Sequence, residues 1–110
     1  MSYVVDLSHT FKREAKRLAK RYATFTDDLE DLIDTLEVNP HQGIGLGGNC
    51  YKIRLAIRSK GKGKSGGARV ITCVVAVRET VYLLSIYDKS DYESLSSDRV
   101  KDLLKELGID

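Results

Sequence analysis

The sequence predicts an α+β domain in which a twisted, mostly antiparallel sheet packs against an N-terminal helical hairpin, with a further helix at the C-terminus. Two neighbouring segments near the N-terminus repeat apolar residues at helical spacing, three strand-like segments follow from residue 50 onward, and a last helical pattern begins near residue 97. The predicted order is strand, helix, helix, three strands and helix. The length fits a single domain covering residues 1–110.

The N-terminal part is expected to form a short strand over residues 3–7 and then two helices. Ser8 can cap the first helix because its hydroxyl accepts a hydrogen bond from an exposed backbone N–H. This helix is expected to end near Tyr22, and the second at Asn39, because the residue before a proline avoids helical geometry. The first helix is basic and the second acidic, so we expect an antiparallel pair with opposite charges side by side.

The first of the three later strands carries a cationic face. Residues 50–58 alternate strictly, which predicts one buried face and one face with Lys52, Arg54 and Arg58. Residues 68–78 are almost wholly apolar, as in a central strand covered on both sides.

The remaining elements follow from shorter signals. Residues 81–89 are expected to form the last strand, and Ser97 or Asp98 to cap the C-terminal helix. The glycine-rich stretch 43–49 is expected to be a loop.

Composition is that of an ordinary soluble domain, with 42% hydrophobic and 31% charged residues. No apolar run is long enough to span a bilayer, and the N-terminus lacks signal-peptide features, so we expect a cytoplasmic protein without membrane association. Cys50 and Cys73 both fall in strand-like segments. We expect two reduced core thiols rather than a disulfide.

Acidic residues are absent between Glu37 and Glu79, although the net charge of the chain is only +2. The cations of this interval are Lys52, Arg54, Arg58, Lys60, Lys62, Lys64, Arg69 and Arg78. Such segregation of charge predicts a surface that binds an anionic partner.

The loop over residues 59–67 is long for a hairpin connection and is rich in glycine and lysine. Its glycines allow close approach to a polyanion, and Arg69 begins the next strand. Two glycine motifs resemble nucleotide-binding fingerprints, but both lead into strands instead of helices, so we expect no nucleotide cofactor. His9 and His41 do not have metal-ligand spacing, so no metal site is expected.

Three segments, YKIRLAI, KSGGARVI and LLSIYDKSD, resemble the RelE/ParE superfamily of bacterial toxins, and the RelE/HigB-like branch most of all. The resemblance implies the toxin of a type II toxin–antitoxin system. It also implies a ribosome-dependent, metal-independent endoribonuclease (an mRNA interferase) that inhibits translation. The implied partners are a cognate antitoxin, the ribosome and messenger RNA.

The same resemblance implies the site residues. Lys52 and Arg54 match the basic strand of the family, and Arg69 matches its phosphate-binding arginine. The C-terminal catalytic tyrosine of the family is absent, since Ser96 lies near its place, and Tyr87 and Tyr92 are the nearest substitutes. The residues implied in catalysis are Lys52, Arg54, Arg69, Tyr87 and Lys89, and the expected RNA contacts are Arg58, Lys60, Lys62 and Lys64.

Two alternatives remain open. A ParE-like member would inhibit DNA gyrase, but would need no phosphate site, so Lys52, Arg54 and Arg69 argue against it. A member that binds RNA without cleaving it is favoured by the missing tyrosine. Tyr87 fits a core position as well as a catalytic one, and Lys89 taken alone is better explained by an ion pair with Asp88 or Asp91.

Overall fold

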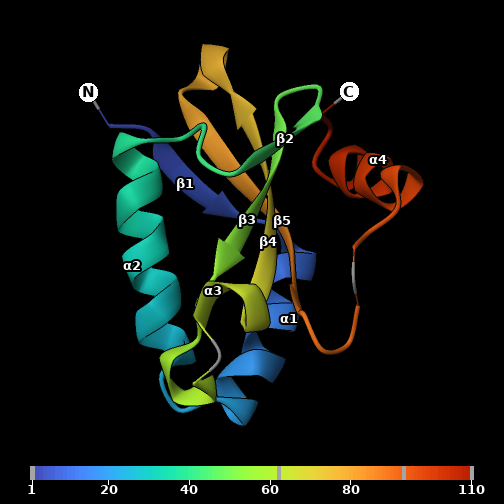
Figure 1. The fold of residues 1–110 in the computed structure, drawn as a ribbon. Coiled ribbons are helices and arrows are strands. Elements are labelled where there is room, and N and C mark those ends of the chain that lie inside the picture. Colours follow the sequence, from blue (N-terminus) through green and yellow to red (C-terminus); the bar gives the residue numbers. More distant parts are fainter. Residues whose placement is uncertain (1, 62, 93, 110) are drawn as a thin grey trace.

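The structure is a computed structural model that describes residues 2–61, 63–92 and 94–109. Its elements are β1 (Val4–Leu7), α1 (His9–Arg21), α2 (Phe25–Val38), β2 (Ile44–Gly47), β3 (Cys50–Leu55), η1 (Arg58–Lys60), α3 (Gly63–Gly66), β4 (Ala68–Val75), η2 (Ala76–Arg78), β5 (Thr80–Asp88) and α4 (Ser97–Glu106). The five strands form one sheet in the order β1-β5-β4-β3-β2 (Figure 1). Among the strands of the described residues, only β1 and β5 pair in parallel. The predicted α+β class and mostly antiparallel sheet are confirmed.

Two hydrophobic layers hold the sheet between helices, with α1 and α2 on one face and α4 on the other (Figure 1). Val70 of β4 belongs to the layer below α1 and α2, whereas its neighbour Ile71 belongs to the layer below α4. Both side chains are almost fully buried. This confirms that β4 is a central strand covered on both sides, since successive residues of a strand point to opposite faces.

Serine caps fix the start of two helices. Ser8 Oγ accepts a hydrogen bond from the Phe11 backbone N–H at 3.0 Å and donates one to the Leu84 carbonyl at 3.0 Å, so the predicted cap also joins α1 to β5. At α4 the cap is Ser96, whose Oγ accepts from the Arg99 N–H at 3.1 Å. The prediction of Ser97 or Asp98 was therefore wrong by one or two residues, because the extended backbone lies at Ser96.

The glycine-rich stretch is not only a loop, because Ile44–Gly47 pairs with β3 as an edge strand. Strand pairing uses backbone groups, so it needs no apolar pattern. The strands are also shorter than predicted. β3 ends at Leu55 and β4 at Val75, and each is followed by a single 3-10 turn.

The opposite charges of α1 and α2 do not pair with each other. Among the described residues, no ion pair joins the two helices. Asp28 and Asp31 of α2 pair instead with Arg58 of η1, and Arg21 of α1 pairs with Asp88 and Asp91. The expected pairing of the helices through charge is therefore wrong. None of the described helices is long and apolar enough to cross a membrane.

Gly67 should be indispensable for joining β3 to β4. A Cβ atom at this position would lie 2.0 Å from the Leu55 carbonyl oxygen, which is backbone and has little freedom to move. We expect Gly67→Ala to lower the free energy of unfolding by about 2–3 kcal/mol, as overpacking does. Urea titration monitored by circular dichroism measures this.

Gly45→Ala is the matched control, because the nearest atom to a Cβ there is a Tyr51 ring carbon at 3.9 Å, an ordinary contact. This variant should unfold at nearly the wild-type urea concentration. Equal midpoints for Gly67→Ala and the wild type would contradict the close approach of the two strands.

Candidate nucleic-acid interface

The sheet places four of the predicted site residues on the face that also carries α4. Arg54 of β3 lies directly opposite Arg69 of β4, and Arg69 lies directly opposite Tyr87 of β5. Residues opposite each other in antiparallel strands share a face, and so does Lys52, two positions before Arg54. We call Arg54, Arg69 and Tyr87 the cross-strand row.

The two arginines of this row stand at the closer of the two spacings found in antiparallel sheets. The Val74 backbone N–H donates to the Asn49 carbonyl at 2.9 Å, which makes Cys50 and Cys73 a non-hydrogen-bonded pair. Pair types alternate along the strands, so Arg54 and Arg69 have the same type, with Cα atoms about 4.5 Å apart. Like charges in this position disfavour folding, and an anion bound between them would relieve the repulsion.

Arg69 is the fixed member of the row. It is 4% exposed, and its Nη1 donates to the Ala68 carbonyl at 3.1 Å. Arg54, in contrast, is exposed, and Lys52 is half-buried. A guanidinium held by its surroundings presents a planar set of donors that suits a phosphate.

Tyr87 contributes a buried phenol beside Arg69. Its side chain is 4% exposed, and its hydroxyl has no hydrogen-bond partner among the described residues. Burial raises the pKa of Tyr87, while the nearby Arg69 charge opposes this shift, so the hydroxyl stays protonated at neutral pH. The ring meets that of the exposed Tyr92 edge to face, with 6.0 Å between centroids.

Hollows lie at both ends of the row. Lys52 and Arg54 line one of about 370 Å³ between β3 and the chain that leads into β2. Tyr87 and Tyr92 line another of about 290 Å³ against α1. The charged residues of this second hollow are the cations Arg17, Lys20 and Arg21 and the acids Glu14, Asp88 and Asp91.

Asp88 follows Tyr87 and points to the opposite face of the sheet, where it binds the helices and the loop. It accepts hydrogen bonds from Tyr22 Oη at 2.5 Å, from Lys60 Nζ at 2.6 Å and from the Ser90 N–H at 2.9 Å. Arg21 Nη2 lies 3.4 Å away. Burial alone would raise the pKa of Asp88, but hydrogen bonds from Lys60, Ser90 and Tyr22 outweigh it and hold this pKa well below its usual range.

Two of the expected RNA contacts are therefore engaged within the protein. The side chain of Lys60 is only 9% exposed because it pairs with Asp88. Arg58 Nε lies 2.6 Å from Asp28 Oδ1, although its side chain remains 60% exposed. Lys62 lies outside the described residues, and so does the side chain of Lys64.

Lys89 is half-buried, and its backbone N–H donates to the Gly67 carbonyl at 3.0 Å. Among the described residues, Asp88 and Asp91 form ion pairs with Lys60 and Arg21, not with Lys89 as the sequence favoured.

Sequence reasoning missed the Asp88 network, because Tyr22 and Asp88 are 66 positions apart and no local pattern joins them. In the part of the chain that the structure describes, no group of three or more His, Cys, Asp or Glu residues could hold a metal ion.

Solved structures of bacterial toxins share this fold. A mutant of the Escherichia coli toxin RelE in the free state superposes with a TM-score of 0.61 at 19% identity, covering 97% of this chain and 99% of that chain. The E. coli RelE mutant bound to an antitoxin RelBc peptide gives 0.57 at 20% identity, with 93% and 94% covered. The toxin–antitoxin complex RelBE2 of Mycobacterium tuberculosis gives 0.56 at 15% identity, with 80% and 99% covered.

These neighbours define the class as a small α+β domain with the RelE fold. The family model described as the RelE toxin of the RelE/RelB toxin–antitoxin system matches residues 8–108. The chain belongs to this family, and it is the toxin of a type II toxin–antitoxin system, as the sequence resemblance implied. Ribosome-dependent cleavage of RNA is the known role of RelE.

Removal of the Asp88 charge should destabilise the protein, because Lys60 would be left buried without its partner. We expect Asp88→Asn to lower the free energy of unfolding by about 3–5 kcal/mol at neutral pH. The folded-state pKa of Asp88 lies below the unfolded value, so its contribution is fully present above about pH 4. That contribution is lost as the pH falls through the folded-state pKa. Urea unfolding of wild type and variant between neutral and acidic pH measures both effects.

Asp91→Asn is the matched control, since the side chain of Asp91 is 50% exposed and its pair with Arg21 is solvated. Its loss should cost about 0–1 kcal/mol. The stabilising role of Asp88 is excluded if Asp88→Asn is no less stable than Asp91→Asn. It is also excluded if the wild type and Asp88→Asn lose stability in parallel on acidification.

Proposed function

We propose that this toxin cuts messenger RNA on the ribosome, in the cytoplasm, and holds the scissile phosphate at the cross-strand row. The observation that carries the proposal is the placement of Arg54 directly opposite Arg69, at the closer strand spacing. With Lys52 on the same face, the two guanidinium groups offer donors that suit a phosphate.

The proposed reaction is attack of the RNA 2′-hydroxyl on the adjacent phosphate. The protein supplies charge and position, because negative charge develops on the phosphate oxygens in the transition state. Arg69 is fixed by burial and offers the planar donors for these oxygens. Arg54 and Lys52 approach from β3, on the side of Arg69 opposite to Tyr87. Tyr87, which stays protonated, offers a hydroxyl donor on the other side of Arg69.

Helix α1, which packs on the other face of the sheet, carries a second cationic surface. Its exposed cations without an ion pair among the described residues are Lys12, Arg13, Lys16, Arg17 and Lys20. The sequence had suggested that the acids of α2 neutralise these cations, but they do not. We infer that this helix binds the phosphate backbone of ribosomal RNA, while the row acts on the messenger.

Replacement of Arg69 should abolish the chemistry and leave binding largely intact. We expect Arg69→Ala to reduce the single-turnover rate of cleavage on programmed ribosomes at least about 100-fold, in line with the loss of a preorganised donor. Arg69→Lys should recover little, because a lysine lacks the planar fork. Primer extension gives the rate, and co-sedimentation with ribosomes gives the binding.

Arg99→Ala is the control, since Arg99 is exposed on α4.

In cells, the wild type should stop incorporation of amino acids before that of thymidine. An earlier stop in thymidine incorporation would favour a gyrase inhibitor. Normal cleavage by Arg69→Ala would remove the row from the mechanism, and a wild type that binds ribosomes but leaves messages intact would favour the non-cleaving alternative.

The cations of α1 should govern affinity for the ribosome. Lys12, Lys16 and Lys20 are spaced one helical turn apart and are exposed, so a triple alanine variant should fold normally. We expect weaker co-sedimentation with ribosomes and a shallower salt dependence, because fewer phosphate counterions are released on binding. Cleavage per bound toxin should not change.

A triple variant, Arg99→Ala with Lys101→Ala and Lys105→Ala, is the charge-matched comparison on α4. Binding by the triple α1 variant equal to that of this comparison would show that α1 does not face the ribosome.

A further inference from the structure

The only two cysteines of the chain face each other across two inner strands of the sheet. Cys50 of β3 lies directly opposite Cys73 of β4, and both thiols are free and buried, as the sequence predicted. They form a non-hydrogen-bonded pair, as the Val74-to-Asn49 hydrogen bond shows. The Cα atoms of such a pair are about 4.5 Å apart, which falls within the range that a disulfide can bridge.

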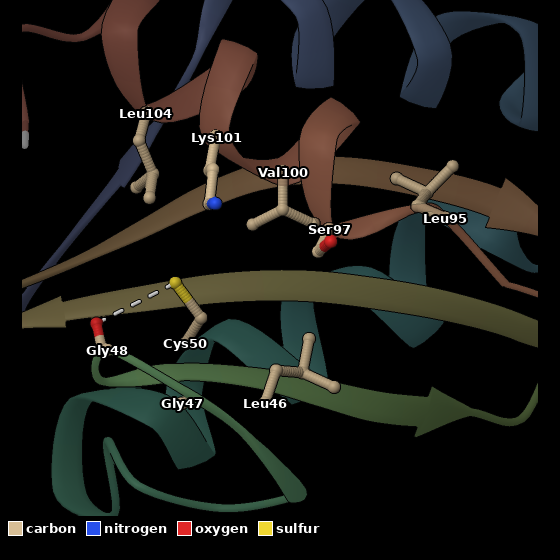
Figure 2. A pocket seen from close by; sticks show the side chains of 9 residues that line it. All are labelled: Leu46, Gly47, Gly48, Cys50, Leu95, Ser97, Val100, Lys101 and Leu104. Atoms are coloured by element: carbon tan, nitrogen blue, oxygen red, sulfur yellow. Dashed lines mark hydrogen bonds between the residues drawn. The ribbon is translucent and has the colours of Figure 1, made fainter.

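A cavity leads to this pair from the side of α4. Cys50 lines a space of about 340 Å³ between α4 and the turn that joins β2 to β3. Figure 2 shows the Cys50 sulfur directed toward α4, with a hydrogen bond to the Gly48 carbonyl at 3.8 Å. Since one water molecule takes about 30 Å³ of liquid volume, the space admits a small oxidant such as hydrogen peroxide.

The two thiols are not equivalent. A hydrogen bond between them lowers the pKa of Cys73, against the effect of burial, and raises the pKa of Cys50. The thiolate is the nucleophilic form of cysteine. The pair therefore offers one thiolate, and the register places the second sulfur where it can react with the oxidised one.

We propose that Cys50 and Cys73 are an oxidation site that hydrogen peroxide converts into a cross-strand disulfide. The thiolate of the pair attacks one peroxide oxygen, the O–O bond breaks, and a sulfenic acid and hydroxide form. The other cysteine sulfur then attacks the sulfenic sulfur, the S–S bond forms and the S–O bond breaks. The two thiols lose two protons and two electrons in total, and the peroxide is reduced to two water molecules.

The disulfide would stabilise the part of the chain that carries the cations of the cross-strand row. The ring from Cys50 to Cys73 contains Lys52, Arg54 and Arg69, together with the turn η1. A disulfide restricts the unfolded chain, so the segment with the crowded cations becomes harder to unfold. The native register already places the two residues opposite each other, so oxidation leaves the cross-strand row in place. This inference rests on the fold and not on the proposed cleavage of RNA.

The test uses the purified reduced protein, treated with a small excess of hydrogen peroxide and then freed of it. We expect the intact mass to fall by two hydrogen atoms, both thiols to disappear from a thiol titration in denaturant, and a single crosslinked peptide to join the two cysteines. The midpoint of thermal unfolding should rise by roughly 5–15 °C, the range expected for one disulfide in a domain of this size. Dithiothreitol should reverse all of these changes.

Cys50→Ser and Cys73→Ser are the controls, and neither should gain stability on oxidation. In each variant the remaining cysteine should gain oxygen, since no second thiol removes its sulfenic acid. Two thiols that persist in the treated wild type, a mass gain of two or three oxygens, or a crosslinked dimer on a non-reducing gel would each overturn the proposal. The wild-type measurements decide it even where a serine variant folds poorly.

Discussion

The buried carboxylate of Asp88 holds together the parts of the molecule that support the candidate site. It accepts hydrogen bonds from α1 through Tyr22, from η1 through Lys60 and from the chain after β5 through Ser90. A buried charge is tolerated only when it is paired and fully hydrogen-bonded. Because neighbouring residues of a strand point to opposite faces, the same strand end presents Tyr87 to the site and Asp88 to the helices. The position of the site thus depends on a contact on the other side of the sheet.

This arrangement divides the basic interval of the chain into two functions. Arg58 and Lys60 are paired with Asp28 and Asp88, so they fix the connection between β3 and β4. On the α4 side, the register places Arg54 directly opposite Arg69. The ion pairs of Arg58 and Lys60 stabilise the hairpin that carries these two arginines.

Sequence patterns predicted most of the fold because the relevant signals are local. Alternation along β3, the apolar run of β4 and the Ser8 cap each depend on a few neighbouring residues, and each is confirmed. β2 was missed because an edge strand of Ile44–Gly47 pairs through its backbone and shows no alternation. The partner of Lys60 was missed because the contact joins residues 28 positions apart, and composition alone could not separate structural lysines from those free to bind RNA.

The position near the missing family tyrosine has a structural function in this chain. Ser96 caps α4 by accepting a hydrogen bond from the Arg99 N–H, and a tyrosine could not make this contact because its hydroxyl lies at the far end of a ring. We propose Tyr87 as the phenol in its place, since Tyr87 lies directly opposite Arg69, the arginine proposed to bind phosphate. Internal attack by the 2′-hydroxyl needs charge stabilisation and fixed geometry more than it needs a particular chain position for the proton donor. A tyrosine on a strand is held in a more fixed position, through cross-strand pairing, than a tyrosine on the segment leading into α4. The absence of a tyrosine near Ser96 therefore does not argue against a functional site.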